Sequence, residues 1–191
     1  MARYDPDKHH RQSIRLKQYD YTQEGTYFVT ICTRGRELYF ELYRQLRHIV
    51  QAQWESLPKR FPNISLDAFV IMPNHLHAII PVGAAAQNLA AAPNRAEASP
   101  APTVLGNIVR AFKSLCVNRW LRYIKQNHMD AVGSIWQRNY YEHVICNETE
   151  LNRVREYIVN NPLKWSFDHE NPTRIIDPAY LAEWKWLEGE A

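Results

Sequence analysis

The chain has 191 residues, of which 46% are hydrophobic and 23% charged, with a formal net charge of +3. This composition favours a soluble globular domain, and no apolar stretch approaches the roughly 18–20 residues of a membrane span. The three cysteines lie far apart, which argues against a disulfide framework or a cysteine zinc site and for a reducing cytoplasm.

The first 22 residues are charged and lack an apolar period, which predicts an extended basic arm. Arg11, Arg15 and Lys17 are its candidate contacts to the phosphates of a nucleic acid. Aromatic and β-branched residues at 27–33 then predict a strand that ends at the turn around Gly35.

Apolar residues at three- and four-residue intervals predict a helix over 41–57, which Pro58 should end. A second strand is expected at 63–72 and a third at 75–81, with a tight turn between them. Together they form a hairpin that should pair with the strand at 27–33.

An alanine- and proline-rich stretch at 83–102 reads as a flexible insert without functional groups. Thr103 is the expected N-cap of a long helix to about residue 126, and 135–145 reads as an extended segment. A last helix should begin after Asn147, because Glu150 occupies the capping-box position, and should end at about residue 160.

The order β-α-β-β-α-β-α predicts an α+β fold of the ferredoxin-like kind, an antiparallel sheet with helices on one face and one additional C-terminal helix. The expected organisation is a basic arm at 1–22, a domain at 23–168 and a tail at 169–191. Because the tail holds three tryptophans, at least part of it should pack on the domain.

Two histidines, His75 and His77, flank Leu76 at the start of the third predicted strand. Successive side chains of a strand point to opposite faces, so both imidazoles should project from the same face. Two converging imidazoles are half of a metal site, although a pair of hydrogen-bonded histidines would give the same pattern.

The last predicted helix adds Tyr157 and Asn161, which lie one turn apart on the same face. Two imidazoles and an amide oxygen could hold a divalent cation beside a phosphate, and a nearby tyrosine could attack that phosphate to form a covalent intermediate. Taken alone, Tyr157 is more typical of a packing residue, because amphipathic helices routinely bury tyrosines, and Asn161 could be a helix cap.

In their order along the chain, these motifs resemble the REP-associated tyrosine transposases, a branch of the single-tyrosine HUH transposases. The resemblance is carried by the segments 27–31, 72–77, 135–145 and 157–165, which read YFVTI, MPNHLH, IWQRNYYEHVI and YIVNNPLKW.

The resemblance implies that His75, His77 and Asn161 bind Mg²⁺ or Mn²⁺ and that Tyr157 forms a 5′-phosphotyrosine. It also implies single-stranded DNA as the substrate, often at palindromic repeats that form hairpins. The protein would act as a monomer or a homodimer.

Trp136, Gln137 and Arg138 are candidates for a structural or DNA-contacting role. Tyr140 and Tyr141 offer a second possible nucleophile, but neighbouring residues of an extended segment face opposite ways. Two other functions stay open: a non-catalytic protein that binds single-stranded nucleic acid, and a metal hydrolase in which water attacks the phosphate.

Overall fold

The structure is a computed structural model that describes residues 24–83 and 104–188. The predicted arm, Thr103 and nearly all of the 83–102 insert lie outside these ranges. None of the helices described there is long and apolar enough to cross a lipid bilayer.

The elements are β1 (Gly25–Cys32), η1 (Arg34–Arg36), α1 (Tyr39–Leu42), α2 (Arg44–Glu55), α3 (Leu57–Arg60), β2 (Phe69–Ile71), β3 (His75–Val82), α4 (Val104–Gln126), β4 (Tyr141–Ile145), α5 (Glu148–Asn160), η3 (Asn161–Phe167) and α6 (Pro178–Glu188).

Four antiparallel strands form one sheet in the order β2-β3-β1-β4, which confirms the expected ferredoxin-like arrangement. The long strands β1 and β3 occupy the centre. Their register places Thr30 opposite His77 and Cys32 opposite His75. Because directly opposed residues share a face of the sheet, Thr30 and His77 point to the same side.

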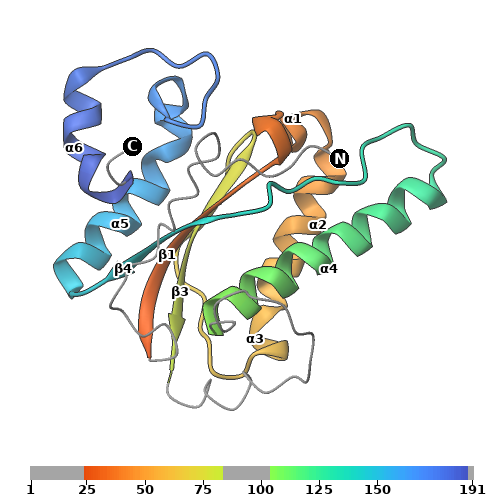
Figure 1. Ribbon diagram of the computed structural model, residues 1–191, viewed down its shortest axis with the longest axis horizontal. Helices are drawn as coiled ribbons and strands as arrows, with labels where there is room; N and C mark the ends of the chain where they lie inside the picture. Colours follow the sequence, from red (N-terminus) through yellow and green to blue (C-terminus); the bar gives the residue numbers. More distant parts are fainter. Residues whose placement is uncertain (1–23, 84–103, 189–191) are drawn as a thin grey trace, which may run out of the picture.

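One face of the sheet is covered by α2 and α4 (Figure 1). Tyr27, Val29 and Ile31 of β1 join Leu76 and Ala78 of β3 in the core on this side. The buried residues of α2 and α4 complete this core with Leu46, Val50, Trp54, Leu105, Ile108, Phe112 and Trp120.

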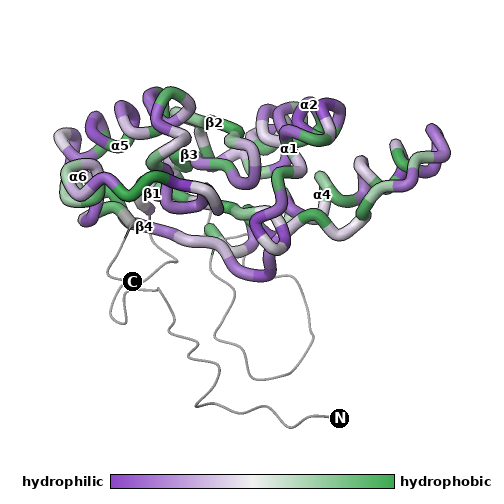
Figure 2. The backbone as a smooth tube through the Cα atoms, turned by 90° about the horizontal axis from the view of Figure 1, so that it is seen from above, coloured by the Kyte–Doolittle hydropathy of each residue, from purple (hydrophilic) through white to green (hydrophobic). Residues whose placement is uncertain are grey.

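The opposite face carries α5 and α6, which lie together at one end of the molecule in Figure 2. Phe28 and Ile79, which alternate with the residues of the first core, pack here against Tyr157 and Ile158 of α5 and against Trp184 of α6. The expectation that part of the tail packs on the domain is therefore confirmed. The alternation of side chains also places His75 and His77 on this face, with Leu76 on the other.

Two predicted strands are shorter in the structure. The segment expected at 63–72 is a regular strand only over β2, although Ser65 N and Asp67 N still donate to Pro81 O and Ile79 O of β3. The Asp67 carboxylate accepts hydrogen bonds from its neighbour Ala68 N at 2.7 Å and from the Arg155 side chain. The segment expected at 135–145 is a regular strand only over β4. Before it, Trp136 makes an isolated bridge with Thr33, and the carbonyl groups of residues 137–139 accept hydrogen bonds from Lys113.

The helix expected at 41–57 is interrupted, and the role assigned to Pro58 was wrong. Tyr43 has a non-helical backbone (φ −120°, ψ 86°), so α1 and α2 are separate helices. Pro58 does not end a helix but lies in the first turn of α3. The backbone N–H groups of a first turn have no partner within the helix, so the N–H that proline lacks would have been unpaired there anyway.

The start of α5 is as predicted. The Asn147 side chain caps the helix by accepting a hydrogen bond from Glu150 N at 2.9 Å. The Glu150 carboxylate reaches back to Cys146 N, at 2.7 Å, and to the His143 ring. This cap fixes the start of the helix that carries Tyr157.

Candidate metal and tyrosine site

His75 and His77 project side by side from the start of β3 and are almost completely buried. Their Nε2 atoms lie 2.9 Å apart. The two imidazoles therefore converge on one point, as the spacing of the sequence predicts.

The orientation of the His75 ring is set by Asn74. The Asn74 amide nitrogen donates to two backbone carbonyls, Arg36 O at 3.0 Å and Glu170 O at 2.7 Å. Its Oδ1 atom is therefore the one that lies 2.8 Å from His75 Nδ1, and an oxygen acceptor there requires the proton on Nδ1. The lone pair of His75 Nε2 is left free for a ligand.

His77 is held in the same way by the neighbouring strand. Its Nδ1 atom lies 2.8 Å from Thr30 Oγ1, the residue opposite it in the β1–β3 register. When Nδ1 donates to this hydroxyl, His77 Nε2 also presents a lone pair. Outer partners of this kind orient the histidines of metal sites.

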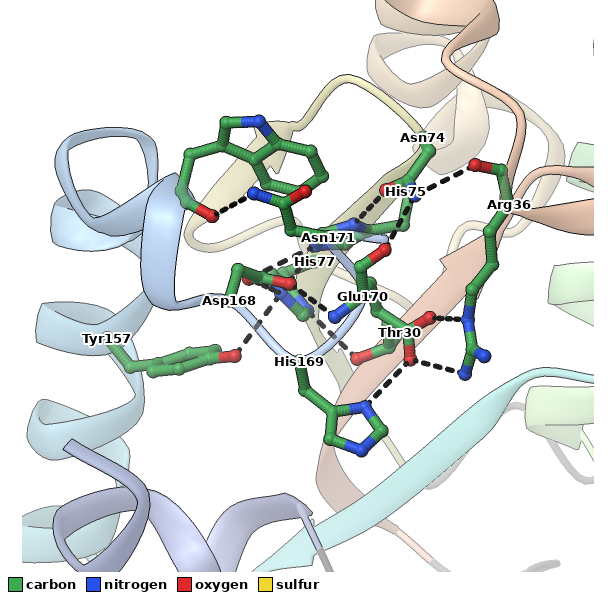
Figure 3. Close-up of polar contacts among 11 residues, drawn as sticks. Thr30, Arg36, Asn74, His75, His77, Tyr157, Asp168, His169, Glu170 and Asn171 are labelled. Carbon is green, nitrogen blue, oxygen red and sulfur yellow. Dashed lines mark hydrogen bonds and ion pairs between the residues drawn. The ribbon is translucent and has the colours of Figure 1, made fainter. Parts of the chain in front are cut away.

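Asp168 supplies a carboxylate to the same point, from the chain that follows η3 (Figure 3). Its Oδ2 atom lies 3.7 Å from His75 Nε2 and 3.9 Å from His77 Nε2. Oδ2 is buried and makes no hydrogen bond within the described ranges, whereas Oδ1 accepts from Glu170 N. The three ligand atoms lie within 4.8 Å of one another, and this donor set fits a divalent cation.

The protonation states also suit a metal. Burial and the neighbouring His77 lower the pKa of His75 to about 3, so its imidazole is neutral at pH 7. Burial by itself would raise the pKa of Asp168, but the contacts with His77 and His75 lower it below its usual value. The site thus combines the neutral imidazole of His75 with the ionised carboxylate of Asp168, the forms that bind metals.

Tyr157 reaches this cluster from α5, and its hydroxyl lies 3.4 Å from His77 Nε2 (Figure 3). Its ring contacts Phe28 edge-on, with centroids 6.0 Å apart, and Trp184 at 4.9 Å. A cavity of about 290 Å³ opens beside it, lined among others by His77, Tyr157 and Asp168. The phenol oxygen therefore stands next to the imidazole group at the edge of a ligand-sized space.

Asn161 follows α5 directly and is 1% exposed. Neither its amide oxygen nor its amide nitrogen makes a hydrogen bond to a residue that the structure describes. Buried amides without partners are uncommon, because leaving them unpaired costs about 1–3 kcal/mol. The amide oxygen of Asn161, one turn after Tyr157, is thus available to bind a ligand such as a metal ion.

Comparison with known proteins finds clear relatives, although no family model matches the sequence. A functionally uncharacterised protein of Haemophilus influenzae is 39% identical over 179 residues, which cover 87% of this chain and 96% of that protein. The REP-associated tyrosine transposase of Escherichia coli K12 is 25% identical over 147 residues, 75% of this chain and 70% of its own length. The chain is thus similar to the REP-associated tyrosine transposases, as its sequence motifs indicate.

Among solved structures, a REP-associated tyrosine transposase bound to a REP hairpin is similar to this chain with a TM-score of 0.47 and 22% identity. The similarity covers 79% of this chain and 74% of that one.

The carboxylate of the candidate site was missed by reasoning from sequence. Asp168 lies in an irregular segment eleven positions after Tyr157, where neither helical nor strand periodicity indicates which way a side chain points. The only available signal was the cluster of polar residues at 168–171, directly after η3.

The other predicted contact residues are dispersed. Trp136 is buried in the core, with its ring centroid 5.6 Å from that of Phe40, so the structure gives it a packing role. Gln137 and Arg138 are exposed, and Gln137 lines the cavity beside Tyr157. Arg11, Arg15 and Lys17 lie outside the described residues.

Proposed function

We propose that this protein is a transposase, a metal-dependent endonuclease and strand-transferase for single-stranded DNA, with Tyr157 as its nucleophile. The observation that carries the proposal is the 3.4 Å approach of the Tyr157 hydroxyl to His77 Nε2, within the group of ligand atoms formed with His75 and Asp168. A buried tyrosine that only packed would not need its hydroxyl at a candidate metal site.

His75, His77 and Asp168 are the proposed ligands of Mg²⁺ or Mn²⁺, and the unpaired amide oxygen of Asn161 is a further one. When bound, the ion would polarise the phosphate and offset the charge that develops during attack. The chain itself contributes the orientation: Asn74 and Thr30 fix the imidazoles, and the α5 packing fixes the phenol.

In the proposed reaction the Tyr157 oxygen bonds to phosphorus, and the bond from phosphorus to the 3′ oxygen of the preceding nucleotide breaks. The phenol loses its proton to solvent, and the departing oxygen gains one, which gives a free 3′ hydroxyl and a 5′-phosphotyrosine. Because the energy of the broken phosphodiester bond is retained in the phosphotyrosine, a second strand can be joined without another energy source.

The proposed substrate is DNA with palindromic repeats that fold into hairpins, and the similarity to the REP-associated tyrosine transposase of Escherichia coli supports this choice. Gln137 and Arg138 are proposed contacts beside the cavity, with Trp136 supporting them from the core, and Arg11, Arg15 and Lys17 are proposed phosphate contacts. We place this activity in the cytoplasm, where the free cysteines stay reduced.

The metal site is tested by replacing its ligands one at a time. His75→Ala, His77→Ala and Asp168→Ala should each abolish Mn²⁺- or Mg²⁺-dependent nicking of a hairpin oligonucleotide. The same variants should lose the thermal stabilisation by Mn²⁺, which is about 2.7 kcal/mol at a hundredfold excess over Kd. Asn161→Ala tests whether the amide oxygen of Asn161 is a metal ligand. If it is, this variant should also bind Mn²⁺ more weakly.

His48→Ala is the matched control, because His48 is exposed on α2, a helix of the opposite face. Nicking that persists without divalent ions in the wild type would contradict the proposal. Metal-dependent cleavage that survives in Tyr157→Phe would instead identify a hydrolase in which water attacks. Hairpin binding without any cleavage would favour a non-catalytic binding protein.

A further inference from the structure

The loop of residues 137–139, just before β4, is held by a single lysine of α4. Lys113 Nζ donates to three successive backbone carbonyls, those of Gln137 at 2.9 Å, Arg138 at 3.4 Å and Asn139 at 2.9 Å. An ammonium group has three N–H donors, so each can be used on this loop. Burial lowers the pKa of Lys113 to about 8, and the group therefore stays largely protonated at pH 7.

The backbone of the loop is also fixed to the end of β1. Gln137 N donates to Cys32 O at 3.0 Å, and Arg34 N donates to Ile135 O at 2.9 Å. The preceding Trp136 is buried in the core against Phe40. The loop is therefore irregular in conformation but attached on two sides.

This attachment leaves the side chains of Gln137, Arg138 and Asn139 exposed. None of the three makes a side-chain hydrogen bond that joins it to another residue in the described ranges. Gln137 and Asn139 line the 290 Å³ cavity that also contains His77 and Tyr157. A volume of this size is at the lower end of the range for small-ligand sites, about 300–1,000 Å³.

Amide and guanidinium side chains are the groups that distinguish nucleobases. Asparagine and glutamine pair with the edge of adenine, and arginine pairs with that of guanine, each through two hydrogen bonds. Such readout requires a fixed backbone, because a mobile loop loses the geometry of paired contacts. The Lys113 contacts supply that fixation next to the proposed nucleophile.

We propose that the 137–139 loop reads the base that flanks the cleaved phosphate, through Gln137 and Asn139, and that Lys113 is its positioning residue. The inference rests on the proposed function and adds to it the part of the site that selects sequence. The ligand is an unpaired nucleobase of the DNA strand held at the metal site.

The test measures cleavage of four hairpin oligonucleotides that carry each base in turn beside the bond that the wild type cuts. The wild type should prefer one base by a factor on the order of 10 to 100, the size of one paired contact. Gln137→Ala and Asn139→Ala should reduce that preference to a few-fold. Both residues are exposed, so neither change should affect folding.

Lys113→Met keeps the length of the side chain but removes its three donors. It should raise KM and relax base preference as the loop variants do, while kcat on the preferred oligonucleotide changes much less. Arg122→Met, an exposed substitution on the same helix, is the control and should leave the preference unchanged. A role in general stability alone would lower the activity on all four substrates equally.

Unchanged base preference in Lys113→Met, or in both loop variants, would overturn the inference while leaving the catalytic proposal intact. If the wild type cleaves none of the oligonucleotides, the proposed function fails. The same four oligonucleotides are then compared by fluorescence anisotropy, and equal affinity for all of them overturns the inference as well.

Discussion

At the scale of single residues, the site depends on one buried asparagine as much as on its histidines. Asn74 has no exposed surface, and its side chain contacts three separate segments of chain: β3 through His75, the turn at Arg36, and the 168–171 segment through Glu170 O. It therefore determines the tautomer of one proposed ligand and anchors the segment that carries Asp168.

Replacing Asn74 by leucine should weaken Mn²⁺ binding by about 10- to 100-fold, the usual effect of removing an outer partner of a metal ligand. Asn74→Asp keeps the acceptor for His75 but loses both donors, so its affinity should be intermediate. Isothermal titration with Mn²⁺ measures both. Asn127→Ala, at an exposed site on the other side of the sheet, serves as the control, and equal affinities in all variants would refute this role.

The neutral state of His75 gives stability a defined pH dependence in metal-free buffer. The unfolded chain binds a proton at His75 below about pH 6.5, whereas the folded chain, with a pKa of about 3, does not. The unfolded state thus binds more protons, and stability falls as pH drops from about 6.5 towards 3, by up to about 1.4 kcal/mol per pH unit.

His75→Gln should reduce that slope, and the exposed His48→Gln should not. Denaturant unfolding at several pH values with a chelator present measures the slope. Identical slopes in His75→Gln and the wild type would show that His75 does not carry this dependence.

At the scale of elements, helices and strands with strong local signals were predictable. The Asn147 cap and the alternation around His75 and His77 are read directly from residue types and spacing, and both are confirmed. The length of the strand at 63–72 and the break at Tyr43 were not predictable, because neither position carries a proline, a glycine or another local signal.

The cap of α5 provides a direct test of a predicted local interaction. Asn147→Ala should lower the free energy of unfolding by about 1 kcal/mol, because Glu150 N loses its acceptor. Asn152→Ala on the exposed face of the same helix should cost less. Chemical denaturation compares the two, and equal losses would mean that the cap contributes nothing specific.

At the scale of the whole molecule, the two faces of the sheet have different roles. The face under α2 and α4 is a hydrophobic core, and the face under α5 and α6 holds the histidines, Asp168 and Tyr157. The sequence indicates two histidines and a tyrosine for this site. Asp168 could not be found in this way, since only the folded path of the chain after η3 brings it to β3.

The central claim, that Tyr157 is the nucleophile, is tested most directly by the covalent product. After incubation with Mn²⁺ and a 5′-labelled or 3′-labelled hairpin oligonucleotide, denaturing electrophoresis and peptide mass spectrometry should find the 3′ fragment attached to Tyr157. Tyr157→Phe should bind the hairpin and give no adduct, while Tyr140→Phe and Tyr141→Phe should still form it. An adduct on another residue, or one that persists in Tyr157→Phe, would contradict the assignment.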